Sequence, residues 1–445
     1  MDGPYESVGT ESILPRDAES GFVRSFEIEE PHEEPKAKWY HASFHSVCGV
    51  VGAGVLGLPF AFSYLGWVGG CIDLTAFLIF AVYTSDLLAR LHECGAPGRR
   101  LNTYGEIADA ALGRRWANVL IRPSQYALLV GLCITYSVTA GQSLKGFVSS
   151  DCQGSECQDG IAKWIALFGA VQLLLSLVRD IHSLWFVSLI GSVMSIGYVV
   201  IAAVVASIDA ATGKGREAAP RTETKARVIF GTFNALGTIA FTFGGQAILP
   251  EIQATLTPVA GTALTLVPMR ISLCVSFVIV FLAYYAVSIS GYIAYGSSVS
   301  SDVLLNIQTS HAVRDAANMM VVFHVAAAFQ VFAQPIFALV ERAIGRTIAP
   351  QKIGFAQRTV MRFVYVVFCT LIAIVFPFFE EMMGIISSIG LIPMSFVFPS
   401  LFWVVSQRPG GFVLAFNLLI ILSCTAVAAL SLVGSVRNII VNLSH

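Results

Sequence analysis

Long, uninterrupted apolar segments follow one another along almost the whole chain after residue 40. Only 12% of the 445 residues are charged and 56% are hydrophobic, whereas soluble domains carry about 25% charged residues. A hydrocarbon core about 30 Å thick requires roughly 20 apolar residues in a helix. The apolar runs are continuous rather than alternating, which favours helices over the strands of a membrane barrel. The sequence therefore predicts an all-α, multi-pass membrane protein.

The apolar segments predict eleven transmembrane helices, of which 162–178 is the shortest. They cover 42–65, 67–90, 117–146, 162–178, 184–208, 227–250, 269–295, 314–340, 359–377, 381–405 and 411–436.

The chain ends are predicted to lie on opposite sides of the membrane. Residues 1–38 form an acidic tail whose low apolar content predicts disorder. Lys and Arg gather in the cytoplasmic loops of membrane proteins, and the loops 90–116 and 341–362 are basic. They place the N-terminus in the cytoplasm and the C-terminus outside. Loop 209–227 is also basic and falls outside in this arrangement.

Two predicted helices contain a cluster of glycines followed by a proline. The first carries GVVGAGVLGLP (49–59) and the sixth carries GTIAFTFGGQAILPEIQATL (237–256). Glycine costs a helix interior about 1 kcal/mol and proline about 3 kcal/mol. One such segment is explained by close helix packing, but two at corresponding places favour helices that are interrupted within the membrane.

Interrupted helices at matching places of two halves indicate a transporter binding site. Five spans precede the second interrupted helix, and an odd number of spans inverts the following repeat in the membrane. The predicted organisation is a disordered acidic cytoplasmic tail (1–38), a first five-helix repeat (39–208), a second five-helix repeat (209–405), and an eleventh helix with the C-terminus (406–445).

An interrupted helix exposes backbone groups that lipid cannot satisfy, so they must face a cavity and a ligand. The helix N-terminus after a break suits a carboxylate, and the carbonyls before it suit an ammonium or another cation. A zwitterionic amino acid matches both poles. The predicted substrate residues are the N–H groups of Ala53, Gly54 and Val55, carbonyls near Gly49, Val50, Phe241 and Thr242, and wall positions Phe243 and Gly244.

The segments WYHASFHSVCGVVGAGVLGLPFAFSYLGW (39–67) and FNALGTIAFTFGGQAILPEIQATL (233–256) resemble the plant-type amino acid/auxin permeases. The likeness is greatest to the lysine–histidine transporter and amino acid permease branches, and it continues through 291–307, 316–341 and 376–403. The resemblance implies eleven helices, a leucine-transporter-like core of two inverted five-helix repeats, and proton-coupled uptake of amino acids. It favours the plasma membrane over an internal membrane.

Ionisable side chains within the spans are candidates for proton coupling, because such groups are costly in a membrane. Histidine titrates near neutral pH, and the candidates are His45, His324 and Asp73. The alternative is a neutral histidine bonded to a backbone carbonyl. Sodium coupling in this fold commonly uses hydroxyls on the eighth helix, and 318–335 contains neither Ser nor Thr. Protons are therefore favoured over sodium.

Five further polar residues have both a functional and a structural interpretation. Gln330 is assigned to the substrate site, with a hydrogen bond between helices as the alternative. Tyr126 and Tyr136 either line the site or pack in the bundle. Asp86 is placed near the cytoplasmic interface, where solvent reaches it. Glu251 follows the second break, where it gates the inner side or caps a helix.

Cys152 and Cys157 lie in a polar loop on the predicted outer side. An oxidising compartment permits a short disulfide between them, and two free thiols are the equal alternative.

Other function classes find little support. His41 and His45 share a helix face as metal ligands could, but the remaining histidines are scattered, so no metal or organic cofactor is expected. No nucleophile–base pair indicates an enzyme. A net charge of −1 without a basic patch argues against nucleic acid. The expected partners are an amino acid and lipid. The alternatives are an amino-acid sensor or channel, and then a carrier for auxin, proline or GABA.

Overall fold

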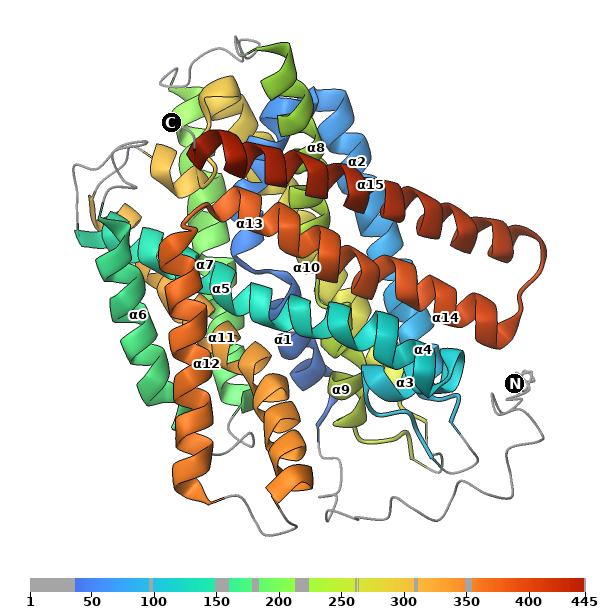
Figure 1. Ribbon diagram of the computed structural model, residues 1–445. Helices are drawn as coiled ribbons and strands as arrows, with labels where there is room; N and C mark the ends of the chain where they lie inside the picture. The colour runs from blue at the N-terminus through green and yellow to red at the C-terminus, as the bar shows by residue number, and fades with distance from the viewer. Residues whose placement is uncertain are drawn as a thin grey trace.

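The fold is built from helices that run back and forth through one bundle (Figure 1). The computed structural model describes residues 37–95, 99–148, 160–177, 184–212, 224–260, 262, 264–307, 311–348 and 354–443. Within these ranges the only extended pairing is a single bridge between Ala37 and Leu256. The all-α prediction is confirmed. The acidic tail up to residue 36, Cys152 and Cys157 lie outside the described residues.

The longer helices have the length and composition of membrane spans. The bounds are α1 (Trp39–Val50), α2 (Leu58–His92), α3 (Tyr104–Leu112), α4 (Arg114–Trp116), α5 (Arg122–Val148), α6 (Ile161–Ser176), α7 (Leu184–Ala211), α8 (Lys225–Thr242), α9 (Leu249–Ala254), α10 (Leu266–Tyr295), α11 (His311–Ile348), α12 (Phe355–Val375), α13 (Phe379–Ile386), α14 (Phe398–Gln407) and α15 (Gly411–Leu443). In the described part of the chain, 9 helical segments are long and apolar enough to cross a membrane. The multi-pass architecture is confirmed, while the count of eleven stays a prediction.

Both predicted interruptions are present, and each divides a membrane segment into two half-helices. Helix α1 ends at Val50, and a 3-10 turn (Ala53–Gly57) leads into α2. Helix α8 ends at Thr242, and α9 starts only at Leu249. Pro59 and Pro250 stand in the first turn of the helix that follows, where the missing N–H of proline costs no hydrogen bond.

The chain also turns sharply between the first two predicted spans. They meet inside α2 at Gly66, which has φ 68° and ψ −179°. A positive φ is accessible to glycine at little cost because it lacks a Cβ atom. This residue therefore allows the second half of the interrupted helix to reverse into the next span.

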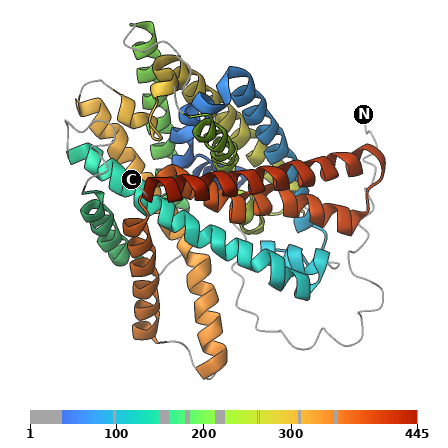
Figure 2. The same ribbon diagram turned by 45° about the horizontal axis from the view of Figure 1, so that its top comes forward.

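The interrupted helices lie at the centre of the bundle. Helix α1 packs against α7 and α10, α8 packs against α2 and α15, and α5 and α11 pack together beside them. In both views α14 and α15 run side by side along one edge, while α12 and the end of α11 extend from another (Figures 1 and 2). The breaks are thus enclosed by continuous helices.

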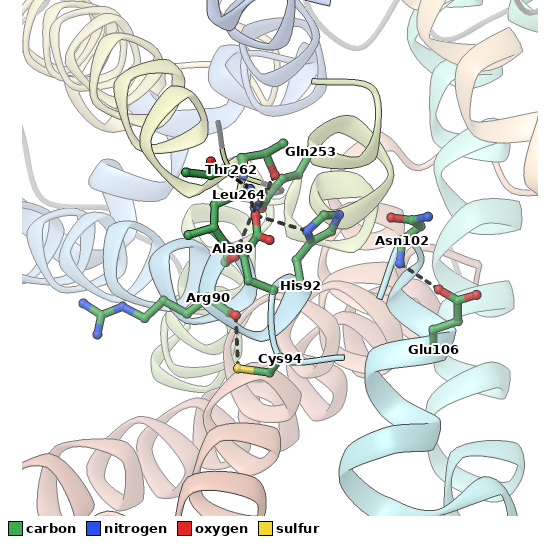
Figure 3. Close-up of polar contacts among 11 residues, drawn as sticks. Ala89, Arg90, His92, Cys94, Asn102, Glu106, Gln253, Thr262 and Leu264 are labelled. Atoms are coloured by element: carbon green, nitrogen blue, oxygen red, sulfur yellow. Dashed lines mark hydrogen bonds and ion pairs between the residues drawn. The ribbon is translucent and has the colours of Figure 1, made fainter. Parts of the chain in front are cut away.

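At the far end of α9, polar contacts tie three elements together (Figure 3). The Glu93 carboxylate, just after α2, accepts hydrogen bonds from N and Oγ1 of Thr265 at 2.8 and 2.7 Å. Gln253 of α9 donates from Nε2 to Glu93 at 3.2 Å and to the Ala89 carbonyl at 3.1 Å. Burial opposes ionisation of Glu93, yet the nearby His92 ring, with Nδ1 3.7 Å from the carboxylate, and the hydrogen bonds from Thr265 hold its pKa below the usual value.

Replacing Glu93 tests this network. Glu93→Ala is expected to destabilise the protein by about 2 kcal/mol at neutral pH, because hydrogen bonds to a buried charged group are lost. A lowered pKa means that ionised Glu93 stabilises the fold above its ordinary pKa of 4.5, and that this contribution fades as the pH falls further. The measurement is the thermal midpoint of purified wild type and variant at neutral and acidic pH.

The matched control for this prediction is Glu93→Gln, which keeps the shape of the side chain but cannot titrate. Its midpoint should lie between those of the other two proteins. A gap between wild type and Glu93→Ala that stays constant from pH 7 to about 4 would contradict a stabilising carboxylate.

Candidate functional site

A narrow cavity lies where the two interruptions meet. Its wall contains most of the backbone predicted to hold the substrate. These residues are Gly49, Val50, Ala53, Gly54, Phe241, Thr242 and Gly244, and Gly52, Gly245 and Ala247 complete the wall at the two breaks. Segments that are far apart in the sequence therefore bring two pairs of helix ends to one hollow.

The first break offers free backbone donors to the cavity. Among the hydrogen bonds of the described residues, none is donated by the N–H groups of Ala53 and Gly54, whereas Val55 N–H donates to the Gly52 carbonyl at 3.3 Å. The free groups begin the helical segment that continues into α2. The N-terminus of a helix carries partial positive charge, so this edge of the cavity suits a carboxylate.

The carbonyls at the opposite helix ends already have donors. Val50 O accepts from Gly52 N–H at 2.9 Å and from the Tyr284 hydroxyl at 2.7 Å. Thr242 O also accepts from the Tyr284 hydroxyl, and Phe241 O accepts from Gly244 N–H at 3.2 Å. Sequence reasoning did not select Tyr284. Its only signal is a buried phenol, which usually needs a partner.

Glycine is required at position 54 because the two interrupted helices approach closely. A Cβ atom there would lie 2.8 Å from Cδ1 of Phe241 and 3.3 Å from Cγ2 of Thr242. At Gly244 a Cβ atom would meet Leu391 Cδ1 at 2.1 Å. Side chains at these positions would push the helix ends apart or fill the space beside them.

The rest of the cavity wall is largely apolar. Leu128, Leu132 and Tyr136 lie on one face of α5 at helical spacing, and Phe332 and Leu391 close the other sides. Tyr136, one of the predicted alternatives, therefore lines the cavity.

Three predicted substrate residues lie outside this wall. Phe243 packs its ring against Tyr284, with ring centroids 5.2 Å apart. Val55 is buried next to the free donors. Gln330 donates to Gln172 Oε1 of α6 at 2.6 Å and to Ser176 Oγ at 3.2 Å, so it links α11 to α6. Tyr126 is also absent from the wall.

His324 connects the first break to α7. It is fully buried, and its Nδ1 lies 2.9 Å from the Gly191 carbonyl. Among the described residues its Nε2 has no hydrogen-bond partner, and a Cβ atom on Gly52 would lie 3.9 Å from it. One ring nitrogen is thus held by the scaffold, while the other faces the break.

The remaining ionisable candidates occupy separate places. His45 Nδ1 lies 2.9 Å from Ser188 Oγ of α7. Asp73 is in α2, and its buried Oδ2 has no hydrogen-bond partner in the part of the chain that the structure describes. Asp86 forms ion pairs with Arg90 and with Arg270 of α10.

Glu251 caps a helix, one of its two predicted alternatives. Its Oε1 accepts from the N–H of Tyr104, 3.1 Å away, at the first residue of α3.

The match to known proteins decides the family. A family model described as transmembrane amino acid transporter protein matches residues 35–441. The chain belongs to the transmembrane amino acid transporter family. It is a multi-pass membrane transporter, and the resemblance seen in the sequence is confirmed.

The curated relatives are plant transporters that match over most of their length. Lysine histidine transporter-like 6 of Arabidopsis thaliana is 36% identical over 425 residues, covering 93% of this chain and 93% of the relative. Amino acid permease 1 of the same species is 31% identical over 404 residues, covering 83% and 82%. GABA transporter 1 is 29% identical over 430 residues, covering 92% of each.

Two solved structures share the fold of this transporter. MhsT in complex with L-phenylalanine aligns with a TM-score of 0.57 and 13% identity, over 91% of this chain and 100% of the other. The substrate-bound outward-open state of a Na⁺-coupled sialic acid symporter aligns with a TM-score of 0.50 and 9% identity, over 90% of each. The predicted leucine-transporter-like fold with interrupted helices is confirmed.

Changing Gly54 tests the site. Gly54→Val is expected to abolish amino acid uptake while the protein still reaches the membrane, because the new side chain meets Phe241 and fills the space beside the free donors. The measurement is uptake of labelled amino acid, normalised to the amount of transporter at the surface.

Gly69→Val is the matched control for this substitution. It adds the same side chain in α2, outside the first break, where a Cβ atom makes only ordinary contacts with Leu65 at 3.4 and 3.9 Å. Its uptake should equal that of the wild type. Normal transport by Gly54→Val would show that the substrate carboxylate does not bind beside residue 54.

Proposed function

We propose that this transporter imports amino acids in symport with protons by alternating access. The observation that carries the proposal is a cavity lined by unbonded N–H groups at one helix start and by the carbonyl ends of two half-helices. Among the described residues, Thr242 O accepts from the Tyr284 hydroxyl alone, so it keeps a lone pair for an ammonium. A free carboxylate and a free ammonium on one small molecule complement such a pair of poles. The amino acid binds between the interrupted helices, and one bundle then rocks against the other to open the site inward.

The favoured substrates are neutral amino acids, over a broad range of side chains. Apart from Tyr136 and Thr242, the side chains around the cavity are apolar or absent, and none is charged. A charged substrate side chain would lie in this cavity without a counter-charge, which is costly. The lysine–histidine transporter-like and amino acid permease relatives support an amino acid as substrate.

Protons are the proposed coupling ion, with sodium the less favoured one. His324 supports this choice because it is fully buried and has one ring nitrogen free at the break. Protonation there would place a positive charge beside the helix that receives the substrate. His45 and Asp73 are the further candidates.

The proposed setting is the plasma membrane, with an internal membrane as the second choice. The N-terminus is cytoplasmic and the C-terminus lies outside. Residues 39–208 and 209–405 form the two inverted repeats, and 406–445 add the last helix. No catalytic step is proposed. A sensor or a channel is the alternative, and a carrier for auxin, proline or GABA is a lesser one, to which the GABA transporter relative is pertinent.

Reconstituted protein distinguishes these alternatives. Proteoliposomes with an inward proton gradient should accumulate labelled amino acid above the external concentration, without added sodium. Unlabelled neutral amino acids should compete, and auxin and GABA should not. A channel would only dissipate the amino acid gradient and a sensor would move nothing, so either result would reject the proposal.

The role of His324 has its own test. His324→Asn places an amide nitrogen near the position of Nδ1, so the bond to the Gly191 carbonyl is retained while the titrating group is lost. Uptake by the variant should depend less on pH than uptake by the wild type, because the titrating ring is absent. An unchanged pH profile of uptake would show that His324 is not the coupling group, and His45→Asn would then be tested in the same way.

A further inference from the structure

Tyr284 holds the two half-helices together at the place where a cation would otherwise be expected. The residue is on α10 and only 1% exposed. Its hydroxyl contacts Val50 O at 2.7 Å and also Thr242 O. Val50 is the last residue of α1 and Thr242 is the last residue of α8. One side chain from a third helix therefore bridges both carbonyl ends.

These two carbonyls form a point of negative potential inside the protein. The C-terminus of a helix carries about half a negative charge, from carbonyls that lack an intrahelical donor. Two such ends converge on Tyr284. In interrupted helices of transporters, carbonyls of this kind are groups that coordinate Na⁺.

The Tyr284 hydroxyl contacts these two carbonyls from the side that faces away from the cavity. Val50 and Thr242 line the cavity, but Tyr284 does not. Its ring is held in place against Phe243, at a centroid distance of 5.2 Å. Gly52 N–H fills the second acceptor position of the Val50 carbonyl. A cation could bind both carbonyl oxygens only by displacing the phenol.

We propose that the Tyr284 hydroxyl takes the place of a metal cation at the junction of α1 and α8, and that it thereby excludes Na⁺ from this junction. The inference deepens the proposed proton coupling and rests on it. The O–H group of the phenol points the positive end of its dipole at the two carbonyls and is covalently fixed to α10. The negative potential of the carbonyls is therefore compensated without any bound ion. Tyr284 is a positioning and specificity-determining residue for the coupling ion.

The neighbouring Tyr285 supplies a matched control. It lies on the same helix but faces outward, and its hydroxyl is hydrogen-bonded to Thr75 at the exposed surface of α2. The same substitution at 284 and at 285 therefore changes the same chemistry with and without access to the two carbonyls.

The experiment uses Tyr284→Asn and Tyr285→Asn in the purified full-length protein, with Na⁺ alone as the probe. Asn removes the ring and the hydroxyl, which leaves Val50 O and Thr242 O open to the ion. The thermal midpoint is measured in sodium chloride and in choline chloride at equal concentration. For Tyr284→Asn, sodium should raise the midpoint by at least about 2 °C, the effect of a bound ligand, with no such change in wild type or Tyr285→Asn.

Each other outcome overturns the inference. The absence of a sodium effect on Tyr284→Asn would show that the junction has no affinity for the ion that the phenol is said to replace. Equal sodium effects on Tyr284→Asn and Tyr285→Asn would place the ion elsewhere. If wild-type uptake proves to be driven by sodium, the proposed proton coupling is wrong. The sodium effect on Tyr284→Asn compared with that on Tyr285→Asn still tests the role of Tyr284 independently.

A second variant decides the matter if Tyr284→Asn does not fold. Tyr284→Phe keeps the ring against Phe243 but leaves Thr242 O without its hydroxyl donor. Its uptake in sodium-free medium should fall about tenfold, as expected for a buried acceptor left unpaired, while Tyr285→Phe should transport normally. Wild-type uptake by Tyr284→Phe would overturn the inference.

Discussion

The need to satisfy backbone hydrogen bonds within a membrane governs this structure. A continuous helix meets that need by itself, and a broken one does not. The chain nevertheless interrupts two membrane helices, after Val50 and after Thr242. The exposed groups find partners in three ways: turns within the break, the phenol of Tyr284, and a cavity at which the N–H groups of Ala53 and Gly54 stay available. The proposed binding site is thus the part of the backbone whose hydrogen bonds the fold leaves unmade.

The enclosing helices make this incompleteness tolerable. Helices α7, α10 and α5 surround the breaks. Each of them contributes a polar contact near the breaks or part of the cavity wall. His324 reaches Gly191 of α7, Tyr284 extends from α10, and Tyr136 extends from α5 toward Gly52. At the end of α9, Glu93 and Gln253 hold α2, α9 and the start of α10 together.

The breaks were predictable from the sequence because glycine and proline act on the chain locally, and their spacing repeats in the two halves. The family was equally accessible, since its motifs are continuous segments. The partners of the exposed carbonyls were not. Tyr284 and Tyr285 are adjacent in an apolar span, and only the rotation of α10 decides which one faces the junction. Likewise, Gln330 contacts α6 rather than the cavity because of helix packing that no local pattern encodes.

The central claim is that the two poles of a zwitterion are held by opposite ends of interrupted helices. The most direct test is competition for uptake by analogues of one transported amino acid that lack either the α-carboxylate or the α-ammonium group. The account predicts that losing either pole weakens competition at least about tenfold, because each removes hydrogen bonds to a charged group. Analogues that compete as well as the parent amino acid would contradict it.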